Sequence, residues 1–155
     1  MTKTVLIPLA DGCEELEAVT LELEAVTLID LLRRANISVI TAGIKQRIVT
    51  GSRGTSLIAD TLLKDHMETD FDMVVLPGGL PGATHLNESP LVHAILKRTY
   101  QNNHAVAAIC AAPLVLANAG LLASKTATSY PGAIKPSDGP KLRLEKMPLS
   151  LMVGC

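Results

Sequence analysis

The feature that most constrains this chain is a set of four short apolar runs, which alternate with longer segments of helical periodicity. The apolar runs are Thr4 to Leu9, Ile37 to Thr41, Asp72 to Leu76 and Ala105 to Ile109. The helix-like segments are Glu14 to Arg34 and Ser89 to Asn102. Continuous apolar runs of this length indicate strands buried on both faces, as in parallel sheets. The alternation therefore predicts a single α/β domain with a doubly wound parallel sheet and helices on both faces.

The first helix-like segment contains a tandem duplication. Glu15 to Leu21 is repeated without change as Glu22 to Leu28. Seven residues make almost two helical turns, with an offset of only about 20°, so we expect one longer helix whose apolar face survives the insertion. A bulge that holds part of the copy away from the surface is the alternative. The apolar positions of the predicted helix are Leu16, Val19, Leu23, Val26 and Leu31.

Three shorter segments complete the predicted elements. Ile48 to Ile58 is rich in β-forming residues but contains two glycines, which indicates a hairpin or an irregular strand. Pro113 to Ala119 is predicted to be a helix that ends at Gly120, and Thr126 to Tyr130 to be a short strand. Ligand chemistry is expected at the carboxyl ends of the strands, in the loops Asp11 to Glu17, Pro77 to Gly82 and Cys110 to Pro113.

Composition disfavours several classes of partner. The 155 residues carry a net charge of -1, no Trp, one Phe and two Tyr, so neither a basic surface nor stacking rings are available for nucleic acid. The apolar run at the N-terminus is too short for a signal peptide or a membrane span. The three cysteines show no CxxC spacing, which favours a reducing compartment and predicts a cytoplasmic protein. No phosphate-binding glycine motif follows the first strand, and we expect no cofactor and no metal.

Cys110 stands where the apolar strand Ala105 to Ile109 gives way to the helix that begins at Pro113. The small neighbours of this cysteine permit a tight elbow, and the start of the helix favours the thiolate over the thiol. A cysteine among alanines is also commonly a small buried apolar residue. Spacing alone leaves both interpretations open.

Five motifs together resemble the DJ-1/ThiJ/PfpI superfamily, and within it the bacterial DJ-1-like branch. They stand in the order of that family and cover Thr4 to about Pro131. The motifs are Pro8 to Thr20, Ile29 to Ala35, Gly51 to Gly54, Val74 to Gly82 and Ala107 to Pro113.

The resemblance implies a flavodoxin-like fold of the class I glutamine amidotransferase type, a homodimer, and Cys110 as a nucleophilic and redox-sensitive residue. It also implies that Glu17 approaches the thiol, which helps only if the carboxyl group is protonated and donates a hydrogen bond to sulfur. On sequence grounds alone, an acid in the first turn of a helix, favoured there by the helix dipole, is the better interpretation of Glu17. The duplication makes Glu24 a rival for the same place.

Further site residues follow from the resemblance. Gly78 and Gly79, with the backbone of Ala111, match the oxyanion-binding positions, although a glycine-rich loop is more often a plain turn. Arg53 matches an arginine on the dimer-facing side, where it would support oxidised sulfur, and is otherwise a solvated surface residue.

Two regions depart from the family pattern. No histidine follows His104, and the stretch where the family often has one reads Thr128 to Pro131, so a full Cys-His-acid triad is unsupported. We expect residues 1–131 to form the DJ-1/PfpI-like domain. Residues 132–155 diverge from the pattern, so we expect one sheet face to lack part of the cover that the family has there.

Three functions are compatible with these residues. The leading hypothesis is a cysteine enzyme that acts on small reactive carbonyl compounds, as a cofactor-independent glyoxalase or as a deglycase of glycated amines and thiols. The second is a redox sensor or chaperone that uses the same thiol without turnover. The third is a degenerate family member that has lost activity.

Overall fold

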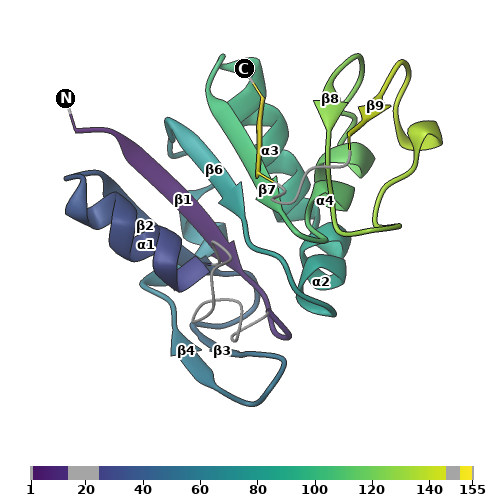
Figure 1. Ribbon diagram of the computed structural model, residues 1–155. Coiled ribbons are helices and arrows are strands. Elements are labelled where there is room, and N and C mark those ends of the chain that lie inside the picture. The colour runs from purple at the N-terminus through teal and green to yellow at the C-terminus, as the bar shows by residue number, and fades with distance from the viewer. Residues whose placement is uncertain (1, 14–24, 146–150, 155) are drawn as a thin grey trace.

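The computed structural model describes residues 2–13, 25–145 and 151–154, and its centre is a six-stranded sheet (Figure 1). The strand order is β10-β7-β6-β1-β2-β5, and all neighbours pair in parallel except β10, which runs antiparallel to β7. The strands are β1 (Thr4–Leu9), β2 (Ser38–Gly43), β5 (Thr61–Leu62), β6 (Met73–Leu76), β7 (Ala105–Ile109) and β10 (Leu151–Gly154). The parallel sheet predicted from the four apolar runs is confirmed.

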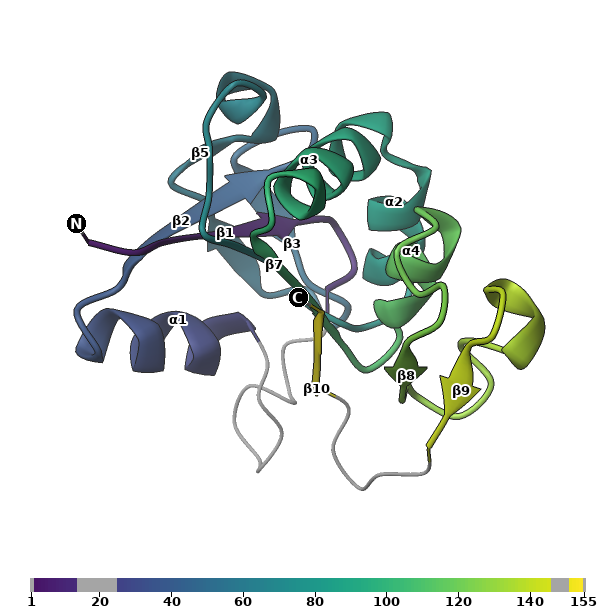
Figure 2. The same ribbon diagram turned by 90° about the horizontal axis from the view of Figure 1, so that it is seen from above.

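Helices cover both faces of this sheet, as predicted (Figure 2). Helix α1 (Ala25–Arg34) lies on one face, and α2 (Gly82–Glu88), α3 (Pro90–Gln101) and α4 (Pro113–Asn118) lie on the other. Successive side chains of a strand point to opposite faces, so each apolar run supplies two separate cores.

Successive residues of each strand belong alternately to the two cores. Leu6, Val74 and Val106 belong to the core beneath α2, α3 and α4. Val5 and Val75, their sequence neighbours, belong to the core beneath α1. Burial on both faces explains why these strands read as continuous apolar runs rather than as alternating ones.

The predicted apolar face of the first helix was wrong within its described part. Val26 and Leu31 are 49% and 48% exposed, whereas Leu28, Ile29 and Leu32 pack against the core. Residues 26 and 31 are five apart, which places them about 140° apart around a helix, so they cannot share one buried face. Most of the duplicated heptad lies outside the described residues.

Helix α3 follows its prediction closely. Ser89 caps it, accepting a hydrogen bond at its side-chain oxygen from the Val92 backbone N–H at 3.5 Å. Val92, Ile95 and Leu96 are fully buried and form the apolar face of this helix. The predicted hairpin is also present, as β3 (Ile48–Thr50) paired antiparallel with β4 (Ser56–Ile58).

Several elements were not predicted. They are β5, α2, the 3-10 helices η2 (Leu63–His66) and η3 (Pro136–Asp138), β9 (Arg143–Leu144) and β10. The short strand expected from Thr126 to Tyr130 is β8 (Thr126–Ala127), which pairs in parallel with β9. The tail after Pro131 therefore contributes two strands. β9 pairs with β8 in a separate two-stranded sheet, and β10 pairs with the outer edge of β7.

Candidate functional site

Cys110 occupies a strained elbow directly after β7. Its φ is 57°, in the left-handed region that costs a residue with a side chain about 1–2 kcal/mol. The backbone N–H of Ala112 closes the turn by donating to the Ile109 carbonyl at 3.0 Å, and α4 begins at Pro113. The elbow leaves Cys110 half-buried between two fully buried segments. This geometry presents a thiol at the end of the sheet, as the sequence predicted.

The loop after β6 packs directly against the cysteine. A Cβ atom added to Gly78 would lie 2.5 Å from the Cβ of Cys110 and 3.4 Å from its Sγ. No side chain fits at position 78 without moving Cys110, so glycine is required there for close approach. The next residue, Gly79, has a φ of 90°, which glycine adopts without strain.

The backbone near the thiol offers hydrogen-bond donors. Among the described residues, neither Gly79 nor Ala111 donates its backbone N–H to another carbonyl, although the Gly79 carbonyl accepts from Ala83 at 2.8 Å. Ala111 is buried, with 4% exposure, and directly follows the cysteine. These two N–H groups have the chemistry that an oxyanion requires.

The loop after β1 joins the same region through backbone contacts. Gly12 donates to the Thr50 carbonyl at 2.7 Å, and its own carbonyl accepts from the Gly82 N–H at 3.0 Å. The carbonyl of Cys13 accepts from the Ser52 N–H at 2.9 Å. The loops after β1 and β6 and the β3–β4 hairpin are thus held together at the carboxyl end of the sheet, where ligand chemistry was predicted.

Tyr130, in the stretch Thr128 to Pro131 where a histidine was sought, lies beside the elbow. Its backbone N–H donates to the Cys110 carbonyl at 2.7 Å, and its side chain is 57% exposed. This bond ties the segment after β8 to the cysteine turn. The sequence motifs contained no signal for this contact, because it joins residues that are distant along the chain.

The remaining predicted site residues are only partly described. Glu17 and Glu24 lie outside the described residues. Arg53 is exposed in the turn of the β3–β4 hairpin, which contacts the Cys13 loop through Ser52. The structure therefore brings Cys110, Gly78, Gly79 and Ala111 together, and it places Arg53 on a neighbouring hairpin.

The cysteines and histidines in the described part of the chain differ in setting. Cys13 is buried with 4% exposure, whereas Cys110 is partly accessible. His66 and His93 bond to residues close to them in sequence, and His85 contacts the carbonyl of Asp11. No group of three or more His, Cys, Asp or Glu side chains among the described residues is placed to hold a metal ion.

The two carboxyl groups with displaced pKa values are part of the framework. The Lys3 ammonium and the Thr4 backbone N–H lower the pKa of Asp72 to about 2. Burial raises the pKa of Asp60, but hydrogen bonds from Thr41 and the charge of Arg33 outweigh it, so the net displacement is downward. Both groups join strands to each other rather than line the thiol elbow.

Comparison with known proteins decides the family. The family model described as DJ-1/PfpI family matches residues 3–142. The chain belongs to the DJ-1/PfpI family. The match spans the elbow, the glycine loop and the β3–β4 hairpin, and it extends into the tail.

Relatives and solved structures agree with this assignment. Protein DJ-1 homolog A of Arabidopsis thaliana is 42% identical over 132 residues, which are 84% of this chain and 32% of that protein. The glutathione-independent glyoxalase DJR-1.2 of Caenorhabditis elegans is 32% identical over 76% of this chain and 63% of that protein. This DJ-1/PfpI chain thus spans about a third of the first relative and under two thirds of the second.

Two solved structures share the fold. The crystal structure of Drosophila melanogaster DJ-1beta matches with a TM-score of 0.81 and 39% identity, over 94% of this chain and 76% of that one. Oxidized DJ-1 of Toxoplasma gondii matches with a TM-score of 0.79 and 31% identity, over 93% and 83% of the two chains. The flavodoxin-like fold expected from the resemblance is therefore confirmed. In the described part of the chain, no helix has the length and apolar character needed to span a bilayer.

Proposed function

We propose that this DJ-1/PfpI protein is a cysteine enzyme that converts small reactive carbonyl compounds without a cofactor. The observation that carries the proposal is the strained elbow, which presents the partly accessible thiol of Cys110 against Gly78. A family relative from Caenorhabditis elegans that bears the name glutathione-independent glyoxalase adds support. Glycated amines and thiols are a second substrate class for the same chemistry, because they also contain a carbon at the carbonyl oxidation level.

The proposed reaction with methylglyoxal begins with addition of sulfur to the aldehyde carbon. The C–S bond forms while the carbonyl electron pair moves to oxygen, and the backbone N–H groups of Gly79 and Ala111 bind the resulting oxyanion. The protonated carboxyl group of Glu17, or of Glu24 in its place, donates its proton to this oxyanion, and the carboxylate so formed moves the proton of that carbon to the neighbouring carbon, while the hydroxyl proton passes to the neighbouring oxygen. The adduct becomes a thioester, which water hydrolyses to lactate and free thiol. One carbon is oxidised and its neighbour is reduced, so no external oxidant is needed.

The test is methylglyoxal turnover by wild type and by Cys110→Ser. We expect kcat/KM to fall on the order of 10³-fold or more, because the hydroxyl group is a far weaker nucleophile than the thiolate. Cys155→Ser is the control for loss of a thiol, and we expect it to retain wild-type turnover. Equal rates for Cys110→Ser and wild type would eliminate the proposal.

A redox-sensing role for the same thiol is the second candidate. It is supported by the contrast between the partly accessible Cys110 and the buried Cys13, and by the oxidized relative from Toxoplasma gondii. Mild peroxide is expected to convert Cys110 to the sulfinate before Cys13 reacts. Peptide mass spectrometry after a short exposure measures this order, and uniform modification of both residues argues against a sensor.

The proposed assembly is a cytoplasmic homodimer, with Arg53 on the side that faces the second copy. The exposed side chains of Ile48 and Ile58 on the same hairpin supply apolar surface for such a contact. Sedimentation equilibrium of wild type and of Ile58→Lys tests it. We expect dimer for the first and monomer for the second, and monomeric wild type would refute the assembly.

A further inference from the structure

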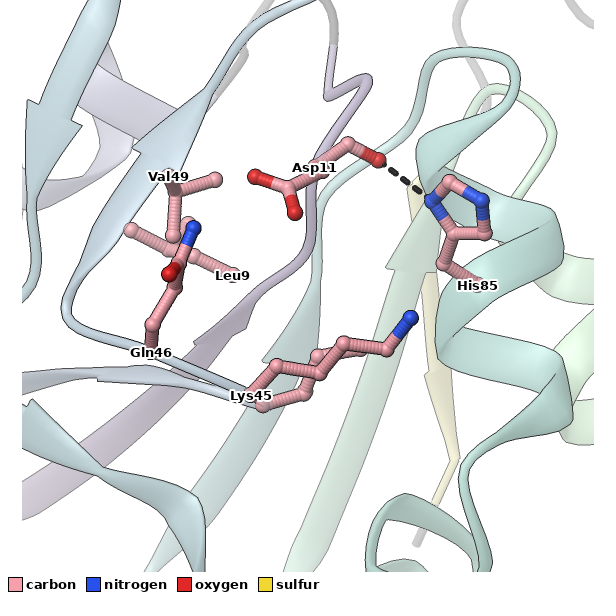
Figure 3. Close-up of a pocket in the computed structure, with 7 residues that line it drawn as sticks. Leu9, Asp11, Lys45, Gln46, Val49 and His85 are labelled. Carbon is pink, nitrogen blue, oxygen red and sulfur yellow. Dashed lines mark hydrogen bonds between the residues drawn. The ribbon is translucent and has the colours of Figure 1, made fainter.

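A pocket of about 310 Å³ lies outside the thiol site. It is bordered by the loop after β2 and by the junction between α2 and α3. The residues that the argument uses are Ile44, Lys45, His85, Glu88, Pro90 and Leu91. A smaller recess shares Ile44, Lys45 and His85 and extends toward Asp11 and Val49 (Figure 3). We call the two together the Lys45–His85 pocket.

This pocket is distinct from the Cys110 elbow. Its walls come from the ends of β1 and β2 and from α2 and α3, whereas Cys110 follows β7, and β6 lies between β1 and β7 in the sheet. Neither Cys110 nor Gly78 lines it. A ligand bound there would therefore occupy a second site.

Hydrogen bonds hold the walls in place before any ligand arrives. The ring of His85 is 2.6 Å from the Asp11 carbonyl through Nδ1, and because a carbonyl only accepts, that nitrogen carries the hydrogen. On the opposite wall, the Ile44 backbone N–H donates to the Leu9 carbonyl at 3.0 Å. A preformed wall of this kind lowers the cost of ordering on binding.

The polar groups of the pocket carry opposite charges. Lys45 supplies an ammonium group, which reaches across the recess toward His85 (Figure 3). Glu88, which is exposed at the end of α2, supplies a carboxylate. Neither side chain forms an ion pair with another described residue. Ile44, Pro90 and Leu91 add apolar surface to the same walls. The larger cavity thus combines one cation, one anion and an apolar wall, and the smaller recess adds the Asp11 carboxylate, which accepts a hydrogen bond from the Thr50 backbone N–H at 2.9 Å.

We propose that the Lys45–His85 pocket binds a small zwitterion of the α-amino acid type with an aliphatic side chain. The ligand carboxylate pairs with Lys45, the ligand ammonium pairs with Glu88, and the aliphatic side chain packs on Ile44 and Leu91. The volume is at the small end of the range of about 300–1,000 Å³ found for ligand sites, which suits a ligand of this size. This inference does not depend on the chemistry of Cys110.

Titration with L-leucine, followed by amide nitrogen–proton NMR of the full chain, tests the proposal. We expect saturable shifts of the Lys45, His85 and Leu91 signals, with a dissociation constant on the order of 1 mM. Two analogues separate the charges: 4-methylpentanoate lacks the ammonium, and 3-methylbutylamine lacks the carboxylate. Each is expected to bind about 2- to 5-fold more weakly than leucine, as suits solvent-exposed ion pairs.

Two charge-removing variants locate the ligand. Lys45→Gln and Glu88→Gln are each expected to weaken leucine binding about 2- to 5-fold. Lys97→Gln is the matched control, because Lys97 is exposed on α3 but does not line the pocket, and it should bind leucine like wild type. Absence of saturable shifts, equal binding of leucine and 4-methylpentanoate, or unchanged affinity in Lys45→Gln each overturns the proposal. The Cys110→Ser variant should bind leucine normally, so loss of carbonyl turnover leaves this result intact.

Discussion

Replacement of Gly78 by alanine tests how closely the glycine loop approaches the thiol. The added Cβ would lie 2.5 Å from the Cys110 Cβ, whereas ordinary contact begins at 3.4 Å. The difference, 3.4 minus 2.5, means that loop and elbow must separate by 0.9 Å. The new methyl group would also lie 3.4 Å from Sγ, beside the path by which an electrophile reaches sulfur.

This displacement sets the expected loss of stability and the expected loss of alkylation rate. Overpacking of a tight contact costs about 1–3 kcal/mol, which in a chain of this length lowers the melting temperature by about 2–12 °C. A displacement of about 1 Å at a reacting group lowers its rate by as much as about 100-fold. We therefore expect the alkylation rate of Cys110 by iodoacetamide to fall between about 10- and 100-fold in Gly78→Ala.

The assay is the alkylation rate of the Cys110 peptide by mass spectrometry, with thermal unfolding followed in parallel. Gly139→Ala is the matched control, because its Cβ would meet the nearest atom, in Leu142, at an ordinary 3.5 Å. The control should alkylate at the wild-type rate. If Gly78→Ala folds and alkylates like Gly139→Ala, the close approach of loop and thiol is refuted.

Three further predictions concern stability. In Asp72→Asn, urea unfolding at pH 7 should show a free energy of unfolding that is lower by about 1–2 kcal/mol. A pKa lowered from 3.8 to about 2 corresponds to roughly 2.4 kcal/mol, and solvent exposure of the carboxylate reduces that value. A depressed carboxyl pKa stabilises the fold above pH 4 and loses that effect as the pH falls toward 2, so wild type and variant should converge there; a constant difference contradicts the assignment. Phe71→Ala removes a ring that is 1% exposed and should cost about 3–5 kcal/mol by the same measurement, with a cost under about 1 kcal/mol as the contrary result. Ser89→Ala removes the cap of α3 and should lower the free energy of unfolding by about 0.5–2 kcal/mol. We expect a value near the lower end because the capping hydrogen bond is long, at 3.5 Å. An unchanged free energy of unfolding would show that the cap contributes nothing.

The strands of the sheet were predictable because burial on both faces leaves a continuous apolar run. Ala105 to Ile109 was predicted with the bounds that β7 has in the structure. Helix α2 escaped prediction because it follows a loop dense in glycine and proline, and only seven residues form it. β10 escaped because its place is set by pairing with β7, which short-range patterns do not encode.

The candidate site, like the fold, was predictable only where residues close in sequence carry the signal. The elbow at Cys110 could be predicted because small residues between an apolar strand and a helix have a local meaning. Its neighbours could not be found in this way: the Tyr130 contact and the Lys45–His85 pocket each join segments that are distant along the chain. Position 17 was assigned by family resemblance alone, and it remains a prediction.

The antiparallel strand β10 has a consequence for the solubility of the protein. Without it, β7 would be the outer strand of the sheet, with a row of backbone N–H and C=O groups open to the strands of other molecules. Because β7 ends at the half-buried cysteine, sheets that joined at this border would also bring thiols of separate molecules close together. Shortening the chain before Leu151 is therefore a route to fibrous or disulfide-linked aggregates, even where the remaining core stays folded.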